Sequence, residues 1–159
     1  MRKHFAISML AAIAGAALAA DSPPVGFPGD YREWTHVKSM VIEKGHPLFG
    51  AFGGIHHIYA NEKAMQGYRN GEFRDGAVIV FDLLEAVEDG NAITEGNRKV
   101  LGVMEKDRAR FGETGGWGFE GFGGGDPEKR VVGANAKQAC FACHAANADD
   151  DFVFSNWRD

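Results

Sequence analysis

The chain has 159 residues, with 17 lysines and arginines against 22 aspartates and glutamates, which gives a formal net charge of −5. The basic residues form no cluster, and this argues against nucleic acid as a partner because phosphate binding needs grouped positive charges. The length fits a single domain that follows a short leader.

The first nineteen residues have the pattern of a secretory signal peptide. A positively charged start precedes an apolar run over residues 5–18, and Ala17-Leu18-Ala19 has the small-x-small pattern of a cleavage site. The apolar run is shorter than the roughly 18 to 20 residues that a membrane-spanning helix needs. We therefore expect a signal peptide over residues 1–19, a periplasmic domain over residues 20–159, and no membrane association after cleavage.

The rest of the chain reads as short helices and strands joined by glycine-rich turns. Tyr31, Trp34, Val37 and Val41 recur at helical spacing, which predicts one amphipathic helix over residues 31–42. The other predicted helices are 62–69, ending at Asn70-Gly71, and an alanine-rich segment at 138–146; the predicted strands are 55–59, 77–84, 99–105 and 117–122. The expected class is α+β, an antiparallel β-sheet with a few flanking helices, one of them C-terminal.

The two cysteines of the chain, Cys140 and Cys143, stand three positions apart, and His144 follows directly. A disulfide at this spacing closes a tiny loop and would contribute little by chain entropy. A zinc site would need a fourth ligand, and a redox-active dithiol belongs at the start of a helix in a βαβ unit. Attachment of a c-type haem uses all three residues, because the thiols add across the two vinyl groups and the histidine lies under the ring. We predict one haem c, bound covalently through Cys140 and Cys143, with His144 as the metal ligand.

Five further residues could supply a second axial ligand to the iron. His56 and His57 are adjacent in the predicted strand 55–59, and because neighbours on a strand face opposite ways, at most one of them points inward. Met40, Met65 and Met104 could give histidine–methionine ligation. Ordinary core packing is the alternative interpretation for each methionine.

Two motifs resemble ligand sites without their usual context. Residues 116–121 match the dinucleotide fingerprint letter for letter, but aromatic residues alternate along them and no helix opens afterwards, so they are predicted to form a strand. Asp149-Asp150-Asp151 lacks the glycine and the terminal glutamate of a calcium-binding loop. It is interpreted as a solvated turn or as the N-terminal charge of a last short segment.

Four blocks occur along the chain in a characteristic order: Tyr31-Arg32-Glu33-Trp34, residues 71–76, residues 115–122, and the haem motif followed by residues 149–154. In this order they resemble the cytochrome P-460 family and its relative cytochrome c′-beta. The resemblance implies a sheet-rich homodimer with one haem per subunit. It also implies an iron that is open opposite the motif histidine, where nitric oxide or hydroxylamine binds.

The two branches of the family differ at the haem edge. The resemblance implies that hydroxylamine oxidation accompanies a lysine cross-linked to the haem, just before the block at residues 71–76. This chain has Tyr68 and Arg69 there, and the nearest lysine, Lys63, lies roughly 8 Å earlier along a helix. The oxidising branch also uses a carboxylate as proton acceptor, for which Glu95 and Glu105 are nearby candidates; the alternative is that they are solvated charges.

We therefore expect the protein to bind nitric oxide or a similar small ligand, to transfer electrons with a redox protein partner, or to do both. Hydroxylamine oxidation is the alternative function, and on either interpretation the catalytic residues are unknown.

Overall fold

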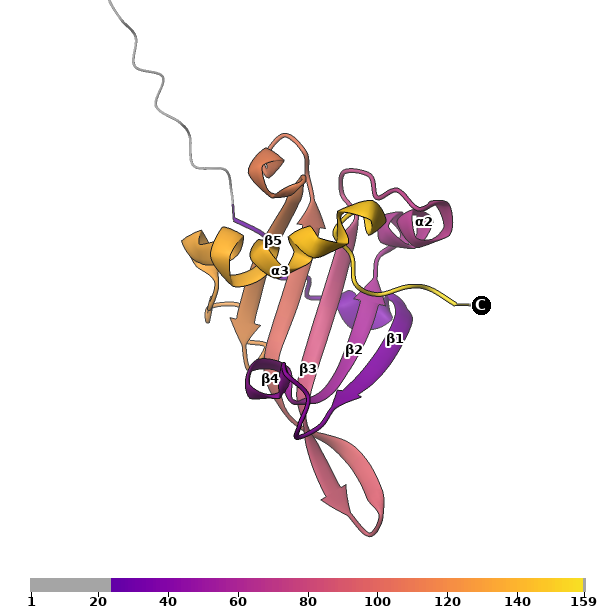
Figure 1. Cartoon of the computed structure of the whole chain (residues 1–159), viewed down its shortest axis with the longest axis vertical. Helices are drawn as coiled ribbons and strands as arrows, with labels where there is room; N and C mark the ends of the chain where they lie inside the picture. Colours follow the sequence, from indigo (N-terminus) through magenta and orange to yellow (C-terminus); the bar gives the residue numbers. More distant parts are fainter. Residues whose placement is uncertain (1–23, 159) are drawn as a thin grey trace, which may run out of the picture.

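The computed structural model describes residues 24–158, so the predicted signal peptide lies outside the described residues. Its centre is a five-stranded antiparallel sheet whose strands follow one another in chain order (Figure 1). The strands are β1 (Thr35–Ile42), β2 (Gly54–Ala60), β3 (Val78–Asp89), β4 (Ala92–Lys106) and β5 (Trp117–Gly123). The sheet carries helical segments on its faces, and the predicted α+β class is confirmed.

The helical segments are short. They are η1 (Tyr31–Glu33), α1 (Phe49–Phe52), α2 (Glu62–Asn70), η2 (Gly112–Thr114), η3 (Gly133–Asn135), η4 (Lys137–Phe141), α3 (Ala142–His144) and η5 (Ala145–Asp150). The last four follow one another closely, and we call residues 133–150 the C-terminal helical segment. In Figure 1 this segment, orange to yellow, crosses one face of the sheet, while the hairpin that joins β3 to β4 extends beyond the sheet's lower end.

The predicted helix over residues 31–42 is wrong, because only Tyr31–Glu33 form a helical turn and β1 follows. β1 pairs with β2 from Thr35 opposite Ala60 to Ile42 opposite Gly54, with a bulge near Val37. The strand is rich in β-branched residues, which lose side-chain freedom in a helix and pack well on a pleated sheet.

The helix α2 begins and ends where the sequence predicts. The side chain of Asn61 accepts a hydrogen bond from the Ala64 N–H and caps the N-terminus. Gly71 closes the C-terminus in the left-handed conformation, with φ of 76°, which glycine adopts without steric cost. The strands predicted at 55–59, 77–84, 99–105 and 117–122 all occur, and β3 and β4 extend further into their long hairpin.

The two faces of the sheet are covered by different parts of the chain. Ile79 of β3 points to the face under α2 and the C-terminal helical segment, which we call the helical face. Val80 points to the opposite face, which we call the N-terminal face because Val25 and Tyr31 pack there. Outside the bulges of β1 and of the β3–β4 pair, alternation along each strand then assigns the strand residues to these two faces. No helix among residues 24–158 is long and apolar enough to span a membrane.

A buried ion pair anchors the end of the C-terminal helical segment to the sheet. The Nζ atom of Lys106 donates to Asp151 Oδ1 at 2.6 Å and to the Gly115 carbonyl oxygen at 3.0 Å. The indole N–H of Trp117 donates to the carbonyl oxygen of Asp151 at 2.8 Å. Asp151 is therefore not a solvated charge, which corrects the interpretation of the acidic run at this one residue, whereas Asp149 and Asp150 are exposed.

Candidate functional site

The Cys-x-x-Cys-His motif lies in the middle of the C-terminal helical segment. Cys140 belongs to η4, a single π-helical turn, and Cys143 and His144 belong to the α-helical turn that follows. The helix predicted over 138–146 is thus helical throughout, although its hydrogen-bonding type changes. π-helical turns inside longer helices are frequent at functional sites.

The two thiols are free and differ in environment. Cys140 is half-buried and Cys143 is exposed. Burial raises the pKa of the Cys140 thiol, and the nearby Glu120 carboxylate and Cys143 add to the effect. The thiol of Cys140 is therefore kept protonated, and both sulfur atoms are available for attachment to another group.

His144 is held as a neutral imidazole with one nitrogen free. Its Nδ1–H donates to the carbonyl oxygen of Phe152 at 2.7 Å, and this bond determines the tautomer. Its ring lies between those of Phe119 and Phe154, with centroids 5.0 and 4.9 Å away. Burial lowers the pKa of His144, against a smaller opposing effect of the Phe152 carbonyl. The lone pair of Nε2 is left available, as in a histidine that binds a metal ion.

Next to Phe119 the helical face of the sheet has few side chains. Gly102 of β4 pairs with Gly121 of β5, and Gly123 follows two residues later on the same face. The space that a Cβ atom on Gly121 would take is filled by Val131, 2.8 Å away, and a Cβ atom on Gly102 would meet Phe81 at 3.4 Å. The glycines therefore let the side chains of Val131 and Phe81 pack directly on the backbone over this stretch.

Apolar side chains that remain exposed border this glycine stretch. Their exposed fractions run from 39% to 60%, and they are Met40, Phe52, Val131 and Phe154. Phe52 of α1 has its ring 5.8 Å from that of Phe81, and Phe154 contacts His144. Exposed apolar side chains gathered on one face indicate a binding surface, and this one suits a large flat apolar ring. No local sequence pattern marks this border, because its members come from β1, α1 and two loops.

The neighbouring histidines of β2 point to opposite faces, as predicted. His56 is 5% exposed on the helical face, and its ring lies 4.6 Å from that of Phe81. Its Nδ1 atom is buried and has no hydrogen-bond partner. Burial, with a smaller effect of His57, lowers the pKa of His56 to about 4.

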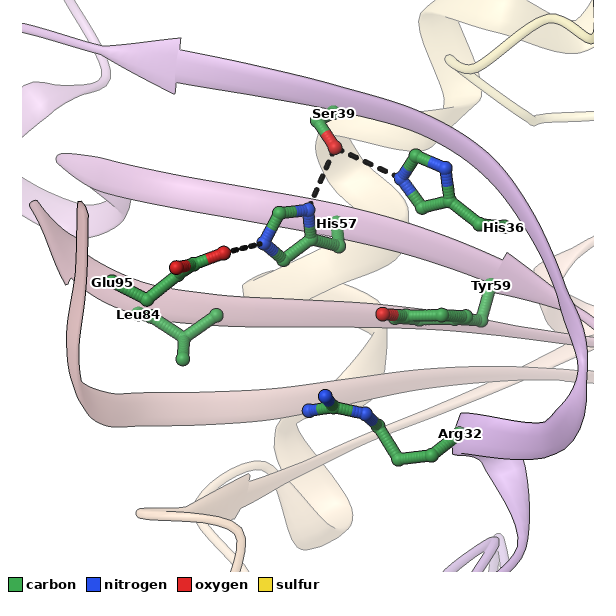
Figure 2. Close-up of a pocket in the computed structure, with 7 residues that line it drawn as sticks. All are labelled: Arg32, His36, Ser39, His57, Tyr59, Leu84 and Glu95. Carbon is green, nitrogen blue, oxygen red and sulfur yellow. Dashed lines mark hydrogen bonds and ion pairs between the residues drawn. The ribbon is translucent and has the colours of Figure 1, made fainter. Parts of the chain in front are cut away.

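His57 lies in a polar pocket on the N-terminal face (Figure 2). The pocket has a volume of about 430 Å³ and is lined by Arg32, His36, Ser39, His57, Tyr59, Leu84 and Glu95. Ser39 Oγ lies 2.6 Å from His57 Nδ1 and 2.8 Å from His36 Nε2, and His57 Nε2 lies 3.1 Å from Glu95 Oε1. These hydrogen bonds join β1, β2 and the β3–β4 hairpin across the face opposite His144.

The two carboxylates considered as proton acceptors do not lie near His144. Glu95 is hydrogen-bonded to His57 in the pocket of Figure 2. Glu105 pairs with Arg110 and points to the N-terminal face, since it stands opposite Val78 in the register. The sheet therefore separates both carboxylates from the motif histidine.

The residues near the expected lysine position point in different directions. Tyr68 turns toward the C-terminal chain, where its hydroxyl lies 2.7 Å from Ser155 Oγ, and burial raises its pKa to about 12. Arg69 is exposed and pairs with Glu62. Lys63 is exposed and donates to the Asp75 carbonyl oxygen at 3.3 Å. Tyr68, and not a lysine, therefore faces the C-terminal chain from this helix.

Two of the three methionines pack in the core. Met65 is fully buried in α2, and Met104 lies in the same apolar cluster opposite Phe119. Met40 is exposed, which contradicts its interpretation as a core residue. The glycine-rich block at 116–121 forms β5, as predicted, and no phosphate-binding loop.

The fold and the site together define a class of protein: a single antiparallel sheet that carries, on one face, a Cys-x-x-Cys-His segment with a free imidazole nitrogen beside an apolar surface. Residues 28–155 match the family described as Cytochrome P460, and the chain belongs to this family. Membership implies that the protein binds haem, which agrees with the apolar surface beside His144. No curated protein matches the chain.

Proposed function

We propose that the protein is an exported c-type cytochrome, in which Cys140 and Cys143 hold one haem and His144 Nε2 binds its iron. The observation that carries the proposal is the hydrogen bond from His144 Nδ1–H to the Phe152 carbonyl oxygen, which leaves Nε2 free. Each thiol adds its S–H across a vinyl double bond, so a C–S bond forms and no oxidant is needed. A bound haem supplies an iron that exchanges one electron and accepts small ligands.

The same chain supports ligand binding or electron transfer more than oxidation of hydroxylamine. One protein ligand at His144 leaves the opposite side of the iron for a small molecule such as nitric oxide. Oxidation in this family is expected to need a lysine at the haem edge and a carboxylate near the iron. Glu95 and Glu105 are engaged on the opposite face of the sheet, and Lys63 is exposed on α2 and bonded to the Asp75 carbonyl oxygen. Hydroxylamine oxidation is therefore the second candidate, and it is favoured by family membership alone.

Three further parts of the proposal rest on the sequence and the resemblance. Export to the periplasm follows from the signal-like pattern of residues 1–19 and from haem attachment outside the cytoplasm. A homodimer with one haem per subunit follows from the resemblance. A redox protein is the partner that electron transfer would require, with nucleic acid and membrane lipid not expected.

The first experiment tests covalent attachment. The full-length gene is expressed in a bacterium that attaches haem c, and the exported protein is purified from the periplasm. Intact mass should equal the chain without its leader plus one haem, and a tryptic digest should yield one haem peptide that contains Cys140 and Cys143. Haem that acid–acetone extracts from the wild type would refute the proposal. A second peptide carrying Lys63 on the haem would favour hydroxylamine oxidation instead.

The second experiment tests the iron ligand. His144→Ala should retain covalent haem, because both thiols remain, but its optical spectrum should lose the features of histidine ligation. His46→Ala is the matched control, since His46 is an exposed loop histidine whose Nδ1 accepts only from the nearby Leu48 N–H. An unchanged spectrum in His144→Ala would show that another residue binds the iron.

A further inference from the structure

His56 and His144 stand at opposite borders of the glycine stretch on the helical face. The ring of His56 lies against Phe81, which pairs with Gly102, and Gly102 pairs with Gly121. Two residues before Gly121 comes Phe119, which contacts His144. The surface that suits a haem therefore has an imidazole on each side, one on β2 and one on the C-terminal helical segment.

His56 differs from the other buried polar side chains of the described chain. These are Asp82, Lys106 and Glu120, and each has charged or backbone partners at hydrogen-bond distance. His56 makes no hydrogen bond within residues 24–158, and its Nδ1 atom is buried without a partner. A buried polar group without a partner costs free energy, and in native proteins such groups are found where a bound molecule or a function accounts for them.

The chemistry of His56 limits what it can do. Burial keeps the imidazole neutral above about pH 4, so the ring carries one N–H donor and one lone pair. A neutral donor stabilises a small ligand whose outer atom gathers negative charge, without placing a net charge in an apolar site. Met40, its neighbour on β1, and Leu83, its neighbour on β3, are apolar, so they offer no competing hydrogen bond.

We propose that His56 is the polar residue of the haem pocket on the side opposite His144, where its ring N–H donates a hydrogen bond to a diatomic or small nitrogenous ligand on the iron. This inference rests on the proposed function, because it needs a haem on the helical face. It adds a ligand-selecting residue at a position that the motif does not contain.

His56→Phe, His56→Gln and His57→Phe test the assignment in the holoprotein. Phenylalanine removes the donor and keeps the ring, whereas glutamine restores an N–H. His57→Phe is the matched control, since it changes the adjacent histidine of the same strand on the opposite face. Circular dichroism and the urea midpoint are recorded for each variant. The probe ligand is carbon monoxide on the reduced protein, followed by its C–O stretching frequency and its dissociation rate.

The expected result is specific to one face of β2. His56→Phe should raise the C–O frequency and speed dissociation about tenfold, the usual scale for one hydrogen bond to a buried ligand. His56→Gln should recover part of both changes, and His57→Phe should match the wild type. Equal frequencies and rates in all four proteins would overturn the inference, as would a wild-type spectrum with two histidine ligands. A wild type without covalent haem would refute the proposed function itself, before any variant is compared.

Discussion

The ion pair between Lys106 and Asp151 gives the sharpest test of how the C-terminal helical segment is held on the sheet. Lys106 is 2% exposed in its side chain and Asp151 is 19% exposed, with 2.6 Å between Nζ and Oδ1. The change Asp151→Asn removes the carboxylate charge and leaves the buried ammonium unpaired. Asparagine is chosen because residue 151 has φ of 49°, a conformation that asparagine tolerates.

The size of the effect follows from burial. Removing one partner of a buried ion pair costs about 3–5 kcal/mol, because the remaining charge is desolvated without compensation. Lys106 keeps its bond to the Gly115 carbonyl oxygen and its position 4.9 Å from the Trp117 ring centroid, so the lower end applies. We expect the free energy of unfolding of the holoprotein to fall by about 3 kcal/mol. This corresponds to about 6–12 °C in melting temperature for a chain of this size.

Urea unfolding of four proteins measures the pair: wild type, Asp151→Asn, Lys106→Met and the double variant. Replacing both charges is far less costly than leaving one unpaired, so the double variant should be more stable than Asp151→Asn. Asp149→Asn is the control, since Asp149 is an exposed neighbour in the same acidic run, and it should change stability by less than about 0.5 kcal/mol. A loss below about 1 kcal/mol in Asp151→Asn, or strictly additive losses, would refute the reasoning.

Three other changes test the sheet. Tyr31→Phe removes the 2.7 Å hydrogen bond to the buried carboxylate of Asp82 and should lower the free energy of unfolding, measured in urea, by about 1–2 kcal/mol. An unchanged free energy would show that the ion pair with Arg98 is enough to stabilise the Asp82 carboxylate. Gly54→Ala places a Cβ 2.1 Å from a β3 carbonyl oxygen at φ of +133°, so its melting temperature should drop, whereas Gly50→Ala, with open space at its Cβ, should not. His56 has a native pKa of about 4, below its unfolded value near 6.5, so the unfolded chain binds the extra proton. Stability should therefore decline as pH falls from about 6.5 toward 4, with a shallower decline in His56→Gln; parallel pH profiles would contradict this assignment.

Much of the fold was predictable from local patterns. The strands 77–84, 99–105 and 117–122 and the helix ending at Asn70-Gly71 follow from residue composition and turn residues, and the structure has each of them. The two-residue period of a strand also required that His56 and His57 face opposite ways. These signals succeed because they depend on steric preferences and periodicity that each segment carries within itself.

Other features depended on segments far apart in the chain. Tyr31, Trp34 and Val37 have helical spacing, but pairing with β2 makes most of that region a strand, since hydrogen bonds to a neighbouring strand outweigh a weak local preference. The faces occupied by Glu95 and Glu105 followed from the register of β3 and β4, which no single segment encodes.

The Cys-x-x-Cys-His motif shows both sides of this division. The sequence by itself determined that two thiols and an imidazole would lie within one helical stretch, because their spacing is local. Only the tertiary structure decided which imidazole nitrogen is free, because the acceptor for Nδ1–H is the backbone carbonyl of Phe152. Every residue has a carbonyl group, so no side-chain pattern marks this one. The position of the Phe152 carbonyl depends on the ion pair between Lys106 and Asp151. These two residues are 45 positions apart in the sequence, and their pairing holds the end of the segment against the sheet.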